Sequence, residues 1–194
     1  MELKPTDLRS TKLYQTLLGA QWNDVHPKVR GSHLSGAELR ANCRLNITGC
    51  SHIIGKIIGR VASLPGPMSD APVTLQIRQI PEGELWNRVF PDRSLKSIQY
   101  ISDDGCLIDR FGMIAFCFRL TISNGCIIHC HERTELRWRG MKLTIPKIFS
   151  PVVTSHEEPD TDESASRIHV SLSVPIIGHL LTYNGGVRPV KEEA

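Results

Sequence analysis

A carboxylate and a guanidinium stand side by side at Asp109 and Arg110, inside the otherwise apolar run IDRFG at 108–112. Because this run lies in a segment with strand-like alternation, we expect at least one of the two charges to face inward. A carboxylate desolvated in an apolar cavity has a raised pKa, which suits general acid or base catalysis. Arg88 and Arg137 are candidate charge partners. The alternative is a structural ion pair or an exposed pair on the surface.

Histidines are the second set of candidates. His33 closes the first helical segment, where it is either a proton carrier at the mouth of a sheet or a helix cap. His129 and His131 are two apart on an expected strand, so both side chains point to one face. Two imidazoles can begin a metal site, but their spacing matches no closed zinc site and a third ligand is needed. We therefore predict no metal and no cofactor. If a metal does bind, His129 and His131 are its candidate ligands. Otherwise the two histidines lie on a solvated strand face.

Aromatic residues with an apolar body suit a cavity that holds an apolar ligand, although core packing explains them equally well. We expect Arg88 and Arg110 to stabilise negative charge that develops on a substrate. The chain contains no nucleophile elbow, P-loop or dinucleotide-binding fingerprint. The residues predicted to line the pocket are Trp86, Phe111, Phe116, Trp138 and Tyr183.

The spacing of apolar residues, which predicts the elements that position these side chains, changes along the chain. Helical spacing of apolar residues predicts a broken amphipathic helix over 11–34. Cys43, Leu45 and Ile47 alternate with polar residues, which predicts a short half-buried strand over 41–48. Ser51 can cap a second helix that ends at Pro65. From residue 72 onward the apolar residues alternate and turn signals recur, which indicates antiparallel strands as far as residue 190.

Within this β region, 106–122 is expected to be one long strand bent at Gly112, and 123–125 a hairpin turn. Residues 157–166 are expected to form an acidic polar loop. We predict one domain over 1–194, with a helical part at about 11–64 and a β part at about 72–190. Its fold class is α+β, with a strongly curved antiparallel sheet or partly open β-barrel of seven to eight strands and two N-terminal helices.

Composition limits the partners. The net charge of +3 comes from 23 basic and 20 acidic residues spread along the chain, without the clustered basic face that nucleic acid requires. No apolar stretch is long enough for a membrane span, and the first residues carry no secretory signal, so we expect a cytoplasmic location.

Four spaced segments carry a resemblance: LYQTLLG at 13–19, ELWNRVF at 84–90, IDRFG at 108–112 and VSLSVPIIG at 170–178. Together they are similar to a bacterial family of domains of unknown function, and the similarity covers nearly the whole chain. Members of that family occur alone or behind reductases similar to saccharopine dehydrogenase. The resemblance therefore implies a setting in small-molecule metabolism, with a reductase of the same pathway as a further candidate partner.

These observations favour a cofactor-independent isomerase, cyclase or dehydratase that acts on a hydrophobic small molecule of secondary metabolism. Asp109 and His33 would be its acid and base. The alternative is a non-catalytic carrier of a hydrophobic metabolite or lipid, and a third possibility is an interaction module for a reductase. A carboxylate and a histidine that converge on the cavity would favour the enzyme over the carrier.

Overall fold

Most of the chain is β-sheet in the computed structural model, which describes residues 13–33, 38–161 and 166–190. The strands form one antiparallel sheet in the order β6-β5-β4-β3-β2-β1-β11-β10-β9-β7-β8. They are β1 (Glu38–Gly49), β2 (Met68–Ile80), β3 (Gly83–Val89), β4 (Ser94–Ile101), β5 (Leu107–Phe111), β6 (Ile114–Ser123), β7 (Cys126–Trp138), β8 (Met141–Thr144), β9 (Val152–Pro159), β10 (Ser166–Val174) and β11 (Gly178–Pro189).

A further pairing between β6 and β7 closes ten of these strands into a barrel, and β8 is an extra strand on β7. The prediction of a partly open, seven- to eight-stranded sheet in an α+β fold is therefore wrong. One reason is that Gly112, at a φ of +58°, turns the chain between β5 and β6, so that 106–122 is a hairpin and not one bent strand. The other is that closure depends on the β1–β11 and β7–β9 pairings, which join segments far apart in sequence.

Close approach of β1 to β11 requires a glycine. Gly185 has a φ of +155°, and a Cβ added there would lie 1.9 Å from the carbonyl oxygen of Arg44. Any other residue would have to push the two strands apart at this seam.

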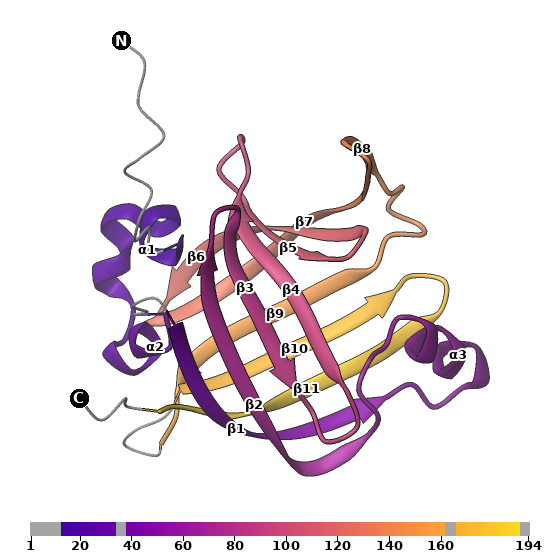
Figure 1. The fold of residues 1–194 in the computed structure, drawn as a ribbon, viewed down its shortest axis with the longest axis horizontal. Helices are drawn as coiled ribbons and strands as arrows, with labels where there is room; N and C mark the ends of the chain where they lie inside the picture. The colour runs from indigo at the N-terminus through magenta and orange to yellow at the C-terminus, as the bar shows by residue number, and fades with distance from the viewer. Residues whose placement is uncertain (1–12, 34–37, 162–165, 191–194) are drawn as a thin grey trace.

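The helices are short and lie at opposite ends of the barrel (Figure 1). At one end are α1 (Leu13–Leu18), the 3-10 helix η1 (Gly19–Asp24) and α2 (Pro27–Gly31), which packs against β9 and β10. At the other end α3 (Ile53–Val61) connects β1 to β2. The region predicted to be helical, about 11–64, thus contains a twelve-residue strand, and its residues 11, 12 and 34–37 lie outside the described part. No helix in the described ranges has both the length and the apolar character needed to cross a bilayer.

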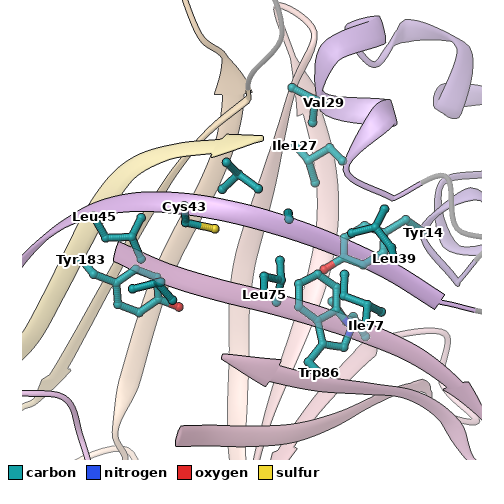
Figure 2. Packing of buried hydrophobic residues seen from close by; sticks show 14 of the residues in the cluster. Tyr14, Val29, Leu39, Cys43, Leu45, Leu75, Ile77, Trp86, Ile127 and Tyr183 are labelled. Carbon is teal, nitrogen blue, oxygen red and sulfur yellow. The ribbon is translucent and has the colours of Figure 1, made fainter. Parts of the chain in front are cut away.

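Apolar side chains from the strands fill much of the barrel interior, and α1 adds Tyr14 from one end (Figure 2). The alternation predicted at Cys43, Leu45 and Ile47 is confirmed, because these side chains are buried while Arg44 and Asn46 are exposed. Leu39 and Ala41 continue the same inward face of β1.

Candidate functional site

The barrel interior keeps a cavity of about 300 Å³. Its volume is at the lower end of the range for small-molecule sites. The wall is mostly apolar and is formed by strands on every side of the barrel, with Ile58 of α3 and Ala62 just after it at one end. A small group of polar residues lines the same space: Tyr14, Arg88, Gln99, Asp109, His129, Ser155 and Glu157.

Asp109 and Arg88 form the first polar pair of the wall. The Asp109 Oδ2 atom lies 3.9 Å from Arg88 Nη2, and both side chains are only about an eighth exposed, at 13% and 12%. Arg88 also donates a hydrogen bond to Ser97 Oγ at 3.0 Å, and its guanidinium carbon lies 5.1 Å from the centroid of the Trp86 ring. Burial raises the pKa of the Asp109 carboxyl, although the charge of Arg88 acts in the opposite direction.

A second polar group joins β7, β9 and the N-terminal helices. His33, just after α2, donates a hydrogen bond from Nε2 to Glu157 Oε2 at 2.7 Å, and the other oxygen of Glu157 lies 4.0 Å from His129 Nε2. All three residues are buried. Because His33 reaches Glu157 from behind the cavity wall, it holds the orientation of a carboxylate that itself faces the cavity.

Tyr14 connects this group to β4. Its hydroxyl donates to Gln99 Oε1 at 3.2 Å, and His129 Nε2 lies 3.2 Å from the same hydroxyl oxygen. Since the single hydroxyl proton is directed at Gln99, the His129 bond requires a proton on Nε2, which donates to Tyr14. The rings of Tyr14 and His33 are also in contact, with centroids 3.8 Å apart.

Burial and neighbouring charges set the protonation states here. Burial lowers the pKa of His129 from 6.5 to about 4, so its imidazole is neutral at pH 7. Burial by itself would raise the pKa of Glu157, but the charge and hydrogen bond of His33 outweigh it and bring the pKa below the ordinary value, which keeps Glu157 ionised. The pKa of Tyr14 is raised well above its ordinary value, chiefly by burial, so the phenol stays protonated.

This arrangement can move protons in an apolar surrounding. A carboxyl with a raised pKa is a better base when ionised and a usable acid when protonated. Neutral His129 and protonated Tyr14 are hydrogen-bond donors, and Arg88 can stabilise an oxyanion. Within the described residues, no three His, Cys, Asp or Glu side chains are grouped so that they could hold a metal ion. His131, the other histidine considered for metal, bonds Thr134 Oγ1 through Nε2 at 3.0 Å.

Comparison with known families matches residues 25–187 to the family described as Domain of unknown function (DUF4166). The chain belongs to the DUF4166 family. No curated protein and no solved structure matches it. The matched range contains six of the seven polar residues named above for the cavity, and Tyr14 precedes it.

Most residues predicted from the sequence for the site of this DUF4166 protein do line the cavity. Asp109 and Arg88 face it together, as do the four aromatic side chains of Trp86, Phe111, Phe116 and Tyr183. His33 is buried behind the wall and reaches the site only through Glu157.

Two predicted residues lie elsewhere. Arg110 follows Asp109 on β5, so alternation turns it to the outside of the barrel, away from the cavity that Asp109 and Phe111 line. Trp138, at the end of β7, is 50% exposed and does not line the cavity. The predicted alternative partner Arg137 does not reach Asp109; its Nε donates to Glu135 Oε2 at 2.8 Å.

The sequence pattern does not identify Glu157, because it predicts an acidic polar loop over 157–166. The structure places 157–159 on β9, whereas 162–165 lie outside the described residues. The inward face of β9 carries Val153, Ser155 and Glu157 at intervals of two. This period was present in the sequence, but the polar composition and Pro159 hid it.

Proposed function

We propose that this DUF4166 protein is a cofactor-independent enzyme that isomerises, cyclises or dehydrates a hydrophobic small molecule held inside the barrel. The observation that supports it is the convergence on one apolar cavity of a carboxyl with a raised pKa, Asp109, and a neutral histidine, His129. A carrier needs only the apolar wall, because titrating groups buried next to an apolar ligand cost free energy.

In the proposed reaction Asp109 removes a proton from a carbon of the substrate, and Arg88 stabilises the negative charge that develops on an adjoining oxygen. The protonated Asp109 then returns the proton at another position, which completes an isomerisation or a ring closure, or gives it to a departing hydroxyl, which leaves as water. A bound substrate oxygen would take the Tyr14 hydroxyl proton in place of Gln99 Oε1, while His129 keeps its hydrogen bond to the Tyr14 oxygen and holds the phenol in position. The electrons and protons balance without a redox partner.

His33 acts as a positioning residue in this proposal. Its hydrogen bond fixes one oxygen of Glu157, and the other oxygen of Glu157 faces His129. A second candidate function, a carrier of an apolar metabolite or lipid, is favoured by the fact that His33, Glu157, His129, Tyr14 and Gln99 satisfy one another and can serve as a purely structural network. The proposed partner is a reductase of the same pathway, in keeping with a setting in small-molecule metabolism.

The experiment begins with native mass spectrometry of the purified protein, followed by organic extraction of any retained compound. The compound is then incubated with wild type, with Asp109→Asn and with Arg110→Gln, and product is measured by liquid chromatography and mass spectrometry. We expect Asp109→Asn to bind the compound but to lose about 10²- to 10⁴-fold in turnover.

The matched control, Arg110→Gln, lies next to Asp109 on the outer face of β5 and should keep wild-type turnover. If wild type binds the compound and leaves it unchanged, the carrier function holds and the enzyme is excluded. Equal turnover by wild type and Asp109→Asn would remove Asp109 from the reaction.

A further inference from the structure

Exposed apolar side chains gather at one end of the barrel. Because neighbouring strands are antiparallel, α3 shares its end with the connections at 90–93, 112–113, 139–151 and 175–177. We call this the α3 end; in Figure 1 it carries α3, β8 and the turn from β10 to β11. Among the described residues, every exposed large apolar side chain except Ile101 and Val190 lies there or on the strand ends beside it: Ile53, Ile54, Ile57, Val61, Val89, Met113, Leu136, Trp138, Met141, Leu143, Ile148, Phe149 and Ile176.

Two segments supply most of this surface. On α3, Ile53 is 74% and Val61 82% exposed, although a helix in a globular protein ordinarily turns such residues inward. The second segment is 136–149, which contains the β7–β8 hairpin and the connection to β9. It carries Trp138 and Phe149, which are 50% and 60% exposed.

The charges on these two segments are all of one sign. Neither 53–61 nor 136–149 contains an aspartate or glutamate. Five basic residues on these segments are exposed, and in the part of the chain that the structure describes none of the five forms an ion pair: Lys56, Arg60, Arg139, Lys142 and Lys147. Both segments of the α3 end are therefore apolar and basic at once.

We propose that the α3 end is a docking surface for an anionic lipid bilayer. Peripheral membrane surfaces combine apolar side chains that enter the acyl boundary with Lys and Arg that bind lipid phosphates and carboxylates. Trp138 is of the residue type that favours the interfacial layer, and the guanidinium carbon of Arg139 lies 4.9 Å from the centroid of its ring. The long basic side chains can keep their charges at the headgroups while their stems lie among apolar groups.

Charge decides between a bilayer and a second copy of this chain. A symmetric dimer through the α3 end would place the basic residues of one copy against those of the other, without acidic residues on these segments to compensate them. An anionic bilayer supplies the opposite charge and an apolar layer together.

The position of α3 relates the surface to the cavity. Ile53, Ile54 and Ile57 of α3 face outward. Ile58 of the same helix lines the cavity, as do Ala62 and Leu64 just after the helix. The helix therefore lies between the docked bilayer and the barrel interior. This step rests on the proposed function: a lipid-soluble substrate would reach the cavity from the bilayer beside α3 without crossing water.

The test is co-sedimentation with vesicles of phosphatidylcholine alone and of phosphatidylcholine containing phosphatidylserine, with binding measured against lipid and salt concentration. We expect binding to the anionic vesicles that weakens as salt is raised. Replacing Lys142 and Lys147 by Gln should weaken binding roughly fivefold for each charge removed. The double variant Trp138→Ser/Phe149→Ser should weaken it at least about tenfold.

Matched controls lie at the opposite end of the barrel, where Ile101→Ser and Arg78→Gln should leave vesicle binding unchanged. The proposal is overturned if the anionic vesicles bind no better than the neutral ones, or if the α3-end and control variants behave alike. Two results together would also overturn it: sedimentation velocity shows a dimer without lipid that the α3-end variants dissociate, and the protein does not bind vesicles. The assay requires neither ligand nor turnover, so its failure is distinguishable from failure of the proposed enzyme.

Discussion

Acid should destabilise this protein through His129. The imidazole is buried with 8% of its surface exposed, and its pKa in the folded chain is lowered from 6.5 to about 4. Between these two values the unfolded chain binds a proton that the folded chain does not, so the free energy of unfolding falls as pH falls through this window. At about 1.4 kcal/mol per pKa unit the loss amounts to about 3 kcal/mol when pH 4 is reached.

The perturbation that isolates this contribution is His129→Gln, because a Gln amide can replace the N–H that donates to Tyr14 without titrating. Two buried carboxyls also titrate in acid, with opposite signs. Glu157, whose pKa is lowered, loses its stabilising contribution as pH falls below 4.5, whereas Asp109, whose pKa is raised, becomes more favourable as pH falls through its folded pKa. Replacing His129 also changes the surroundings of Glu157, but Glu157 titrates below pH 4.5, so the difference between the two proteins at higher pH reports His129.

The assay is urea denaturation at pH 7, 6, 5 and 4.5, followed by tryptophan fluorescence, with the exposed His179→Gln as control. We expect wild type and His179→Gln to lose stability together over this range, and His129→Gln to lose about 2 to 3 kcal/mol less. If His129→Gln shows the same pH dependence as wild type, the burial argument for His129 is wrong.

Three further predictions concern stability and use the same denaturation assay. Gly185→Ala should cost several kcal/mol, because its Cβ would meet a backbone oxygen at 1.9 Å, whereas Gly105→Ala, with open space around it, should cost only about 1 kcal/mol; equal costs would contradict the close approach at the seam. Glu157→Gln should cost about 1 to 3 kcal/mol, because it removes the carboxylate that accepts the buried hydrogen bond of His33, whereas Glu132→Gln in an exposed pair should cost under about 1 kcal/mol; the reverse order would refute the account of this buried bond. Leu107→Ala, at a side chain 1% exposed on the cavity wall, should cost about 2 to 5 kcal/mol, and a loss near zero would mean that the barrel collapses around the gap.

The sequence predicts the alternation of individual strands better than it predicts the closure of the barrel. Alternation at Cys43, Leu45 and Ile47 correctly predicts an inward face, and the Ser123-Asn124-Gly125 turn correctly predicts the hairpin of β6 and β7. Closure depends on which distant strands pair, and period-two alternation is the same in an open sheet and in a barrel. Gly112 marked an interruption in the sequence, but its positive φ and the hairpin that it allows follow from the pairing of β5 with β6.

The residues of the site also fall into two groups: those that the local sequence predicts and those that depend on contacts with distant parts of the chain. Local apolar context predicts that at least one of Asp109 and Arg110 faces inward, with Arg88 or Arg137 as its charge partner. The structure turns Asp109 to the cavity and places Arg88 beside it. Glu157 could not be found in this way, because a carboxylate on a polar segment is ordinarily solvated and its burial here depends on His33 from another part of the chain. Trp138 shows the opposite error: its aromatic type fits a pocket, but the hairpin end on which it lies carries it to the outside.

Deuterium exchange tests the central claim, that groups in the barrel cavity move a proton on an apolar ligand, most directly. The compound that the protein retains is incubated in D₂O with wild type, Asp109→Asn or the outer-face control Arg110→Gln, and its mass is followed over time. The account predicts deuterium on carbon with wild type and Arg110→Gln, and a rate at least about 100-fold lower with Asp109→Asn. Absence of exchange with wild type, or exchange that proceeds equally in Asp109→Asn, would contradict it.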